Sequence, residues 1–368
     1  MKYIFEDVLE IKNGKNQKAV ENSAGQYPIY GSGGVMGYAD DYICDADTVI
    51  IGRKGSINNP IYVTERFWNV DTAFGLSAKR ELLLPRYLFY FCKKFDFEKL
   101  NKTVTIPSLT KSDLLKIKID LPVISKQQEV VARLSKIETV IELRKQELQL
   151  LDDLIKARFV EMFGDPVNNE KGFVKAPMGD YMTVLTDFSS NGSYKTLDNG
   201  VTMYDEPNYA WMVRTTDLES GDMDSIKYID ESAYELLSKS KIFGGEIIMN
   251  KIGSAGKIYL MPQTDMPASL GRNAFMFRYD ERINVKFLYH LLTSDYGQNE
   301  IQQYVRGAVT KTITKNDARS VLIIVPPIEL QNEFEIFVNQ VDKSKVVVQK
   351  ALDETQILFN SLMQQYFG

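Results

Sequence analysis

Basic and hydroxyl side chains occur in two glycine-containing turns, a combination suited to contact with phosphate. The first turn reads Arg53-Lys-Gly-Ser56 and the second reads Asn250-Lys-Ile-Gly-Ser254. Ammonium and hydroxyl groups donate hydrogen bonds to phosphate oxygens, and glycine lets the backbone approach a phosphate closely. A simple hairpin turn has the same sequence pattern, so both interpretations remain open. If the turns bind nucleic acid, the candidate residues are Lys54, Ser56, Asn250, Lys251 and Ser254.

A second set of basic residues recurs in the chain at a spacing of 204 positions. Lys102 matches Arg306, and Lys111 matches Lys315. Thr, Ser and Asn residues lie between them and can donate hydrogen bonds to phosphates and base edges. A charged run is usually only a solvated surface, but recurrence in register favours a shared binding role. The candidates from these segments and from the second half of the chain are Lys102, Lys111, Arg272, Arg306, Lys311 and Lys315. We expect the lysines to hold phosphates, and Arg272 or Asn250 to contact a base edge.

Motifs for catalysis or metal binding are missing from the sequence. The glycines of Gly31-Ser-Gly-Gly-Val-Met-Gly37 do not have dinucleotide-binding spacing. Asn59-Pro-Ile-Tyr62 departs from the Asn-Pro-Pro-aromatic motif of adenine methyltransferases at its third residue. Cys44 and Cys92 lack metal-ligand spacing, and the single histidine, His290, cannot form a His-based metal site. We therefore expect no active site, no metal and no cofactor on this chain.

The elements that would position the candidate residues begin with two heptad stripes. Apolar residues recur every three and four positions over 134–162, and the same spacing returns over 338–366. One such helix cannot bury its stripe alone, whereas two can bury their stripes against each other. The sequence predicts two long helices packed as a coiled-coil spacer. The predicted seam residues are Leu134, Ile137, Ile141, Leu148, Leu151, Ile155, Val338, Val341, Val348, Leu352, Phe359 and Leu362.

The repeat extends beyond the helices. Alternating apolar residues predict strands over 115–121 and 321–325, and a proline ends each strand. Ile-x-x-Gln-x-Glu follows in both copies, at 124–129 and 328–333. Ser125 with Gln128 forms a capping-box pattern at the first helix start. Short β-branched and aromatic runs between Gly and Asp turns predict β-rich modules elsewhere.

The predicted fold class is α+β, with two β-rich globular parts, two long helices packed as a coiled coil and an internal repeat. The predicted segments are 1–123 for the first globular part, 124–164 for helical region 1, 165–327 for the second globular part, and 328–368 for helical region 2. The net charge of −5 argues against a highly basic, free-standing DNA binder, although local basic faces remain compatible with it. No apolar run has the length of a membrane span and no signal-peptide core is present, so we expect a cytoplasmic protein.

Taken together, these features resemble the specificity subunit of type I restriction–modification systems. The resemblance covers essentially the whole chain and rests on the order and duplication of the Pro-x-Ile-x-x-Gln-x-Glu helix entries, Pro122 to Glu129 and Pro326 to Glu333, with Pro327 inserted in the second. The Gly-Ser turns and Tyr30-Gly-Ser-Gly-Gly34 are also typical.

The resemblance implies a non-catalytic subunit in which the globular parts 1–123 and 165–327 are target recognition domains, each reading one half of a bipartite DNA site. It also implies that the helical regions 124–164 and 328–368 form an antiparallel coiled coil, which sets the gap between the half-sites in a pseudo-twofold arrangement. It implies two methyltransferase subunits as partners, which supply S-adenosylmethionine chemistry, and restriction subunits, where present, that supply ATP- and Mg-dependent translocation and cleavage. Because the two domains differ in sequence, the target is expected to be non-palindromic double-stranded DNA. Two other hypotheses are a coiled-coil adaptor that reads no DNA and an enzyme with its own methyltransferase or nuclease activity.

Overall fold

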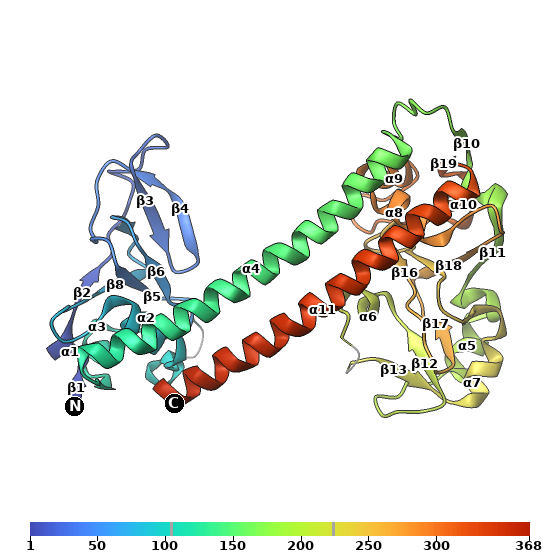
Figure 1. Cartoon of the computed structure of the whole chain (residues 1–368). Helices are drawn as coiled ribbons and strands as arrows, with labels where there is room; N and C mark the ends of the chain where they lie inside the picture. The colour runs from blue at the N-terminus through green and yellow to red at the C-terminus, as the bar shows by residue number, and fades with distance from the viewer. Residues whose placement is uncertain (104–105, 223–224) are drawn as a thin grey trace. The chain divides into compact units, whose positions relative to one another are not determined.

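Two structural units divide the chain. The computed structural model describes residues 1–103, 106–222 and 225–368. Unit 1 comprises residues 1–148 and 347–368, and unit 2 comprises residues 149–346. Each unit contains small β-sheets and parts of both long helices, α4 (Ile124–Phe163) and α11 (Ile328–Phe367). The predicted α+β class, with two β-rich parts and two long helices, is confirmed (Figure 1).

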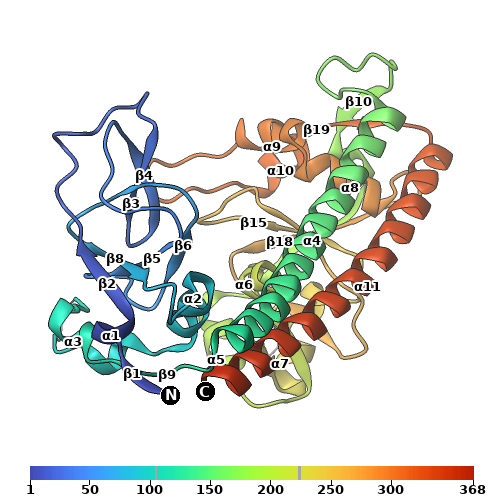
Figure 2. The same cartoon turned by 60° about the vertical axis from the view of Figure 1, so that its left-hand side comes forward.

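Unit 1 is built on a four-stranded antiparallel sheet in the order β2-β8-β5-β6. A three-stranded sheet, β4-β3-β7, and a two-stranded pair, β1-β9, accompany it. Helix α2 packs on β5 and β8 and contacts α4 (Figure 2). The strands and short helices of unit 1 are β1 Lys2–Ile4, α1 Phe5–Val8, β2 Leu9–Asn13, β3 Tyr27–Gly31, β4 Gly34–Ala39, β5 Thr48–Gly52, β6 Ile61–Val63, β7 Trp68–Asn69, β8 Ala73–Ala78, α2 Pro85–Lys94, η1 Phe97–Leu100, α3 Lys111–Leu115 and β9 Lys118–Asp120.

Unit 2 repeats this plan with additions. Its first four-stranded sheet has the order β11-β18-β15-β16, its second has the order β13-β12-β17-β14, and β10 pairs with β19. Its elements are β10 Val174–Pro177, η2 Met178–Tyr181, β11 Met182–Asp187, η3 Phe188–Asn191, α5 Tyr194–Gly200, β12 Ala210–Val213, α6 Thr215–Ser220, β13 Lys227–Ile229, α7 Glu231–Leu236, η4 Ser238–Ser240, β14 Lys241–Ile242, β15 Ile247–Asn250, β16 Ile258–Leu260, β17 Ala268–Leu270, β18 Ala274–Tyr279, α8 Val285–Thr293, α9 Asp295–Gln302, α10 Lys315–Ser320 and β19 Leu322–Val325.

The predicted strand over 115–121 is longer than the observed one. Thr110 accepts a hydrogen bond from the Asp113 N–H and starts helix α3, which runs to Leu115. Only Lys118–Asp120 remains extended, and this strand pairs with β1. Local capping therefore overrides the alternating pattern at its start. In the second copy, β19 lies within the predicted range.

The long helices pack antiparallel within each unit. In unit 1, the buried Leu134 and Ile141 of α4 share a core with Phe359 and Met363 near the end of α11. In unit 2, the end of α4 shares a core with the start of α11. None of the predicted seam residues is exposed, and those at 137, 148, 151, 348, 352 and 362 are half-buried. The predicted stripe misses Val130, Phe159, Phe334 and Met363, which are all buried because a globular part covers a second flank of the helix.

A buried glutamine ties the start of each long helix to its own unit. The Gln127 side chain accepts a hydrogen bond from the Leu84 N–H at 2.9 Å and donates to the carbonyls of Leu82 and Pro122, both at 2.9 Å. Because α4 begins at Ile124, Ser125 lies inside the helix and the capping-box prediction is wrong. At this helix start, the main-chain N–H of Gln127 donates a hydrogen bond to the Val123 carbonyl.

The second copy reproduces this arrangement. The Gln331 side chain accepts from the Asn284 N–H at 2.9 Å and donates to the carbonyls of Arg282, at 3.1 Å, and Pro326, at 2.8 Å. Both glutamines are fully buried. The shared Gln of the duplicated helix entry is therefore a structural residue that fixes the strand–helix corner.

Candidate nucleic-acid interface

The first Gly-Ser turn is held by main-chain bonds to two neighbouring segments. The Arg53 N–H donates to the Thr72 carbonyl at 2.7 Å, and the Arg53 carbonyl accepts from the Leu109 N–H at 2.9 Å. The Gly55 N–H donates to the Pro107 carbonyl at 3.0 Å. The turn at 53–56 therefore lies beside the segment that leads into α3 and Lys111.

Unit 2 repeats these bonds one for one. The Lys251 N–H donates to the Asn273 carbonyl at 2.8 Å, and the Lys251 carbonyl accepts from the Ile313 N–H at 3.1 Å. The Gly253 N–H donates to the Lys311 carbonyl at 2.9 Å. This match makes Arg53, not Lys54, the counterpart of Lys251. It also brings the predicted turn residues and the predicted downstream basic residues together in each unit.

Glycine is required at both turns for backbone reasons. Gly55 has φ of 80° and Gly253 has φ of 83°, a left-handed conformation that disfavours other residues. The backbone conformation of the turn therefore accounts for both glycines. Ser56 and Ser254 beside them are exposed, as are Lys54 and Lys311, and within the described ranges their side chains form no ion pair or hydrogen bond.

The second basic pair has the same partner in each unit. Lys102 forms an ion pair with Asp113 at 2.9 Å, and Arg306 forms one with Asp317 at 2.9 Å. Each aspartate lies in a short helix, α3 or α10, and also accepts a hydrogen bond from the threonine that caps that helix. About three quarters of each basic side chain is exposed, 74% for Lys102 and 73% for Arg306. Both basic side chains are therefore accessible to a phosphate while each forms an ion pair with a neighbouring carboxylate.

Two lysines of unit 2, Lys251 and Lys315, bind a buried aspartate at the end of β11. Asp187 binds Lys251 Nζ at 2.7 Å through one oxygen and Lys315 Nζ at 2.8 Å through the other. Ser190 donates to it at 2.6 Å, and Lys315 also donates to Ser190 at 2.7 Å. Burial acts to raise the pKa of Asp187, but the hydrogen bonds from the two lysines and Ser190 outweigh burial and lower the pKa to about 2. Asp187 is therefore ionised and holds both ammonium groups in place.

This lowered pKa predicts a pH-dependent stability contribution. The unfolded pKa of an aspartate is about 3.9, so the contribution is complete above about pH 4 and is lost as the pH falls towards 2. We expect Asp187→Asn to lower the free energy of unfolding at pH 7 by about 2 kcal/mol, and the difference from wild type to shrink below pH 4. Denaturant unfolding of both proteins at pH 7 and pH 3 tests this. A constant difference would contradict it.

Two predicted base-reading residues are placed less favourably than the sequence suggested. Asn250 is buried, with its side chain donating to the Tyr259 hydroxyl at 3.4 Å, so it cannot contact a base edge in this conformation. Its position as the last residue of β15, between two neighbouring strands, explains this burial. Arg272 is exposed, pairs with Asp198 and lies over the Phe188 ring.

The phosphate candidate Lys111 of unit 1 is exposed, and its side chain donates a hydrogen bond to the Ile11 carbonyl at 2.6 Å.

Sequence reasoning missed Arg53 and Asp187. Aligning the two Gly-Ser pairs would have identified Arg53, because it precedes Gly55 by the same two residues that separate Lys251 from Gly253. No comparable signal marks Asp187. It comes from a third segment of the chain and ends an unremarkable alternating run.

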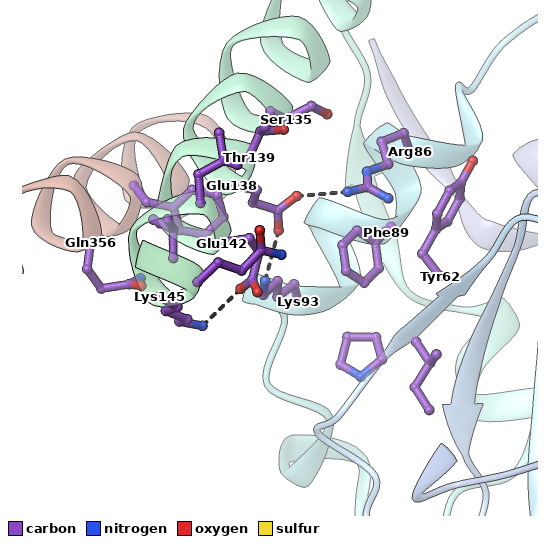
Figure 3. Close-up of a pocket in the computed structure, with 16 residues that line it drawn as sticks. Tyr62, Arg86, Phe89, Lys93, Ser135, Glu138, Thr139, Glu142, Lys145 and Gln356 are labelled. Atoms are coloured by element: carbon purple, nitrogen blue, oxygen red, sulfur yellow. Dashed lines mark hydrogen bonds and ion pairs between the residues drawn. The ribbon is translucent and has the colours of Figure 1, made fainter. Parts of the chain in front are cut away.

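A separate recess in unit 1 lies between β6, α2 and the two long helices (Figure 3). Glu138 of α4 binds Arg86 at 2.8 Å and Lys93 at 3.0 Å, and it accepts from the Tyr90 hydroxyl at 2.6 Å. Burial acts to raise the pKa of Glu138, but bonds from Tyr90 and Lys93 prevail and lower the pKa. These bonds fasten α2 to α4. The recess thus contains a structural ion pair.

The described parts of the chain contain no cluster of His, Cys, Asp or Glu that could hold a metal ion. His290 is largely buried and packs edge-on against Phe334 at 5.4 Å, and burial lowers its pKa to about 4. No helix over the described residues is long and apolar enough to cross a membrane.

A family model described as the type I restriction modification DNA specificity domain matches residues 2–152 and 180–355. The chain belongs to this family. Similar curated proteins are type I restriction enzyme specificity subunits. The MjaVIII subunit of Methanocaldococcus jannaschii is 22% identical over 85% of this chain and 73% of its own length, and the Escherichia coli EcoBI subunit is 20% identical over 86% and 71%.

Solved structures of the family support the fold. The S subunit of a type I restriction–modification system from M. genitalium matches with a TM-score of 0.64 and 16% identity, over 100% of this chain and 96% of that one. A second match, from a study of complex assembly and conformational transition in the type I system, has a TM-score of 0.56 at 16% identity, over 100% of this chain and 97% of that one. At these identities the likeness concerns the specificity-subunit fold alone.

Proposed function

We propose that this chain is the non-catalytic specificity subunit of a type I restriction–modification complex and that it recognises a bipartite, non-palindromic sequence in double-stranded DNA. Residues 1–123 and 165–327 are the proposed target recognition domains. Residues 124–164 and 328–368 are the proposed helical spacers. Two methyltransferase subunits, and restriction subunits where present, are the proposed partners.

The observation that carries the proposal is the duplicated turn. Each unit presents a Gly-Ser turn next to the segment that leads into α3 or α10, and the same main-chain bonds hold it in both units. Basic residues occupy equivalent positions at the turn, Arg53 and Lys251, and at the start of the short helix, Lys111 and Lys315. Basic groups on equivalent frames suit the sequence-independent phosphate backbone, which is the same at both half-sites. The surrounding side chains differ between units, and this difference supports unequal half-sites.

The proposed phosphate contacts are Lys54, Ser56, Lys102 and Lys111 in unit 1, and Lys251, Ser254, Arg306, Lys311 and Lys315 in unit 2. Arg53 joins them as the counterpart of Lys251. Arg272 remains the proposed base-edge contact, because it is exposed and its guanidinium has donors beyond those that meet Asp198.

Alanine replacement of Lys111 or Lys315 tests the proposal. In the assembled complex, each change should weaken binding of specific and random duplexes alike, roughly five- to tenfold at about 0.1 M salt, and reduce the magnitude of the salt slope by about 0.9. Phosphate contacts carry no sequence information, so discrimination should hardly change. Lys136→Ala, which removes an exposed lysine from α4, is the matched control. Unaltered affinity for both variants would refute these contacts.

A further inference from the structure

The Asp187 cluster of unit 2 combines two positive charges and one negative charge in a site that opens to solvent at Lys315, whose side chain is 31% exposed. The side chain of Asp187 is 7% exposed and that of Lys251 is 15% exposed. An ammonium group has three N–H donors. Within the described residues, Lys251 uses one of them on Asp187, and Lys315 uses two, on Asp187 and Ser190. The cluster retains unused donors and a net charge of +1, which suits one phosphodiester group.

The equivalent place in unit 1 lacks the carboxylate. Strand register sets Asn13 opposite Phe74 in unit 1 and Asp187 opposite Phe275 in unit 2. The basic groups match as well, because the Arg53 guanidinium lies 5.9 Å from the Phe74 ring centroid and Lys251 Nζ lies 5.7 Å from that of Phe275. Asn13 therefore stands where unit 2 has Asp187.

The positive charges of the two basic groups in unit 1, Arg53 and Lys111, are not offset by a carboxylate. Lys111 donates to the Ile11 carbonyl at 2.6 Å, and Arg53 donates to the Asp71 carbonyl at 3.4 Å. In the portion of the chain that the structure describes, no carboxylate lies within ion-pair distance of either group. A neutral carbonyl leaves the charge of its donor uncancelled. The pair therefore carries a charge of +2, against +1 for its counterpart.

We infer that this single strand-end position sets how many phosphate charges each half of the protein neutralises: Asn13 leaves two basic groups for the backbone in unit 1, and Asp187 leaves the equivalent of one in unit 2. The inference rests on the proposed DNA-binding function. Asp187 is a positioning residue that orients two lysines and limits their sequence-independent attraction. Unit 2 then depends more on base contacts than unit 1 does.

The test is the salt dependence of binding to a random-sequence duplex by the full-length chain, alone and assembled with methyltransferase subunits of its own system. Asp187→Asn should steepen the plot of log K against log salt by about 0.9 and raise affinity roughly eightfold at about 0.1 M salt. Asn13→Asp should do the reverse by a similar amount. The double variant Asp187→Asn, Lys315→Met should return to the wild-type slope. Asp265→Asn makes the same charge change at an exposed loop position and should leave the slope unchanged.

The outcomes separate this inference from the proposed function. If the wild-type chain and complex fail to bind duplex DNA at low salt, the proposed function falls and the inference falls with it. If wild type binds but a folded Asp187→Asn protein shows an equal or shallower slope, the inference alone is overturned. Circular dichroism checks the fold. Should Asp187→Asn not fold, Asn13→Asp decides, because Asn13 is exposed, and an unchanged slope there overturns the inference.

Discussion

Replacing Gln331 with leucine should lower the free energy of unfolding of unit 2 by about 3–5 kcal/mol. The side chain is fully buried, and its amide satisfies one N–H and two carbonyls from two segments, 282–284 and the end of the strand at Pro326. Leucine keeps the volume but leaves those three main-chain groups without partners, at a cost of about 1–3 kcal/mol each, and burial of an apolar side chain offsets part of this loss. Gln127→Leu should destabilise unit 1 by a similar amount, because its bonds are equivalent.

The two tryptophans allow the units to be followed separately. Trp68 lies in unit 1 and Trp211 in unit 2, and both are buried. In a Trp68→Phe background, denaturant unfolding followed by fluorescence reports unit 2. The control is Gln340→Leu, the same replacement at an exposed site of unit 2 on the same helix, which should change stability by less than about 0.5 kcal/mol. If Gln331→Leu behaves like this control, the hydrogen bonds at the corner contribute little.

Removing one matched heptad from both long helices should change the DNA target itself. Deleting residues 144–150 and 346–352 shortens each helix by about 10 Å, which corresponds to about three base pairs. Methylation directed by the assembled complex should move to a motif with the same half-sites and a gap shorter by about three base pairs. Genome-wide mapping of methylated adenine measures the motif directly.

The matched deletion has an internal control. Deleting only 144–150 should abolish directed methylation, because the two helices lose their common register. An unaltered gap after the double deletion would show that the helices do not set it. The same mapping on the unmodified complex delivers both half-sites, and methylation that persists without this chain would favour an adaptor that reads no DNA.

The long helices could be predicted from sequence because their signals are local. Heptad spacing, the entry at 124 and 328 and the glycine at 164 all lie within a few residues of the structure they specify. The stripe was underestimated at Phe159 and Phe334, because their burial depends on α8, a segment more than a hundred residues from α4. Heptad spacing predicts the residues that one partner helix buries, but it does not predict residues buried by a further element such as α8.

The sheets and the basic cluster depend on distant segments. The parallel pairs β3–β7 and β12–β17 join strands that no turn connects, so their pairing has no sequence signal. The Asp187 cluster draws on residues 187, 251 and 315 from three separate elements. Sequence reasoning identified two of its three members through the repeat. The third breaks the repeat, since Asn13 replaces it, and comparison of the two halves therefore could not reveal it.

The sharing of α11 between the units also has a consequence for biosynthesis. Unit 2 is one contiguous stretch, whereas the core of unit 1 includes Phe359 and Met363, which are translated after every residue of unit 2. The amino-terminal unit therefore cannot close its core until the carboxy-terminal unit has already emerged from the ribosome. Domains usually fold in the order of their synthesis. In this chain the order of folding is reversed, because unit 1 completes its core after unit 2. Until then, the apolar stripe of α4 in the nascent chain is not covered by α11.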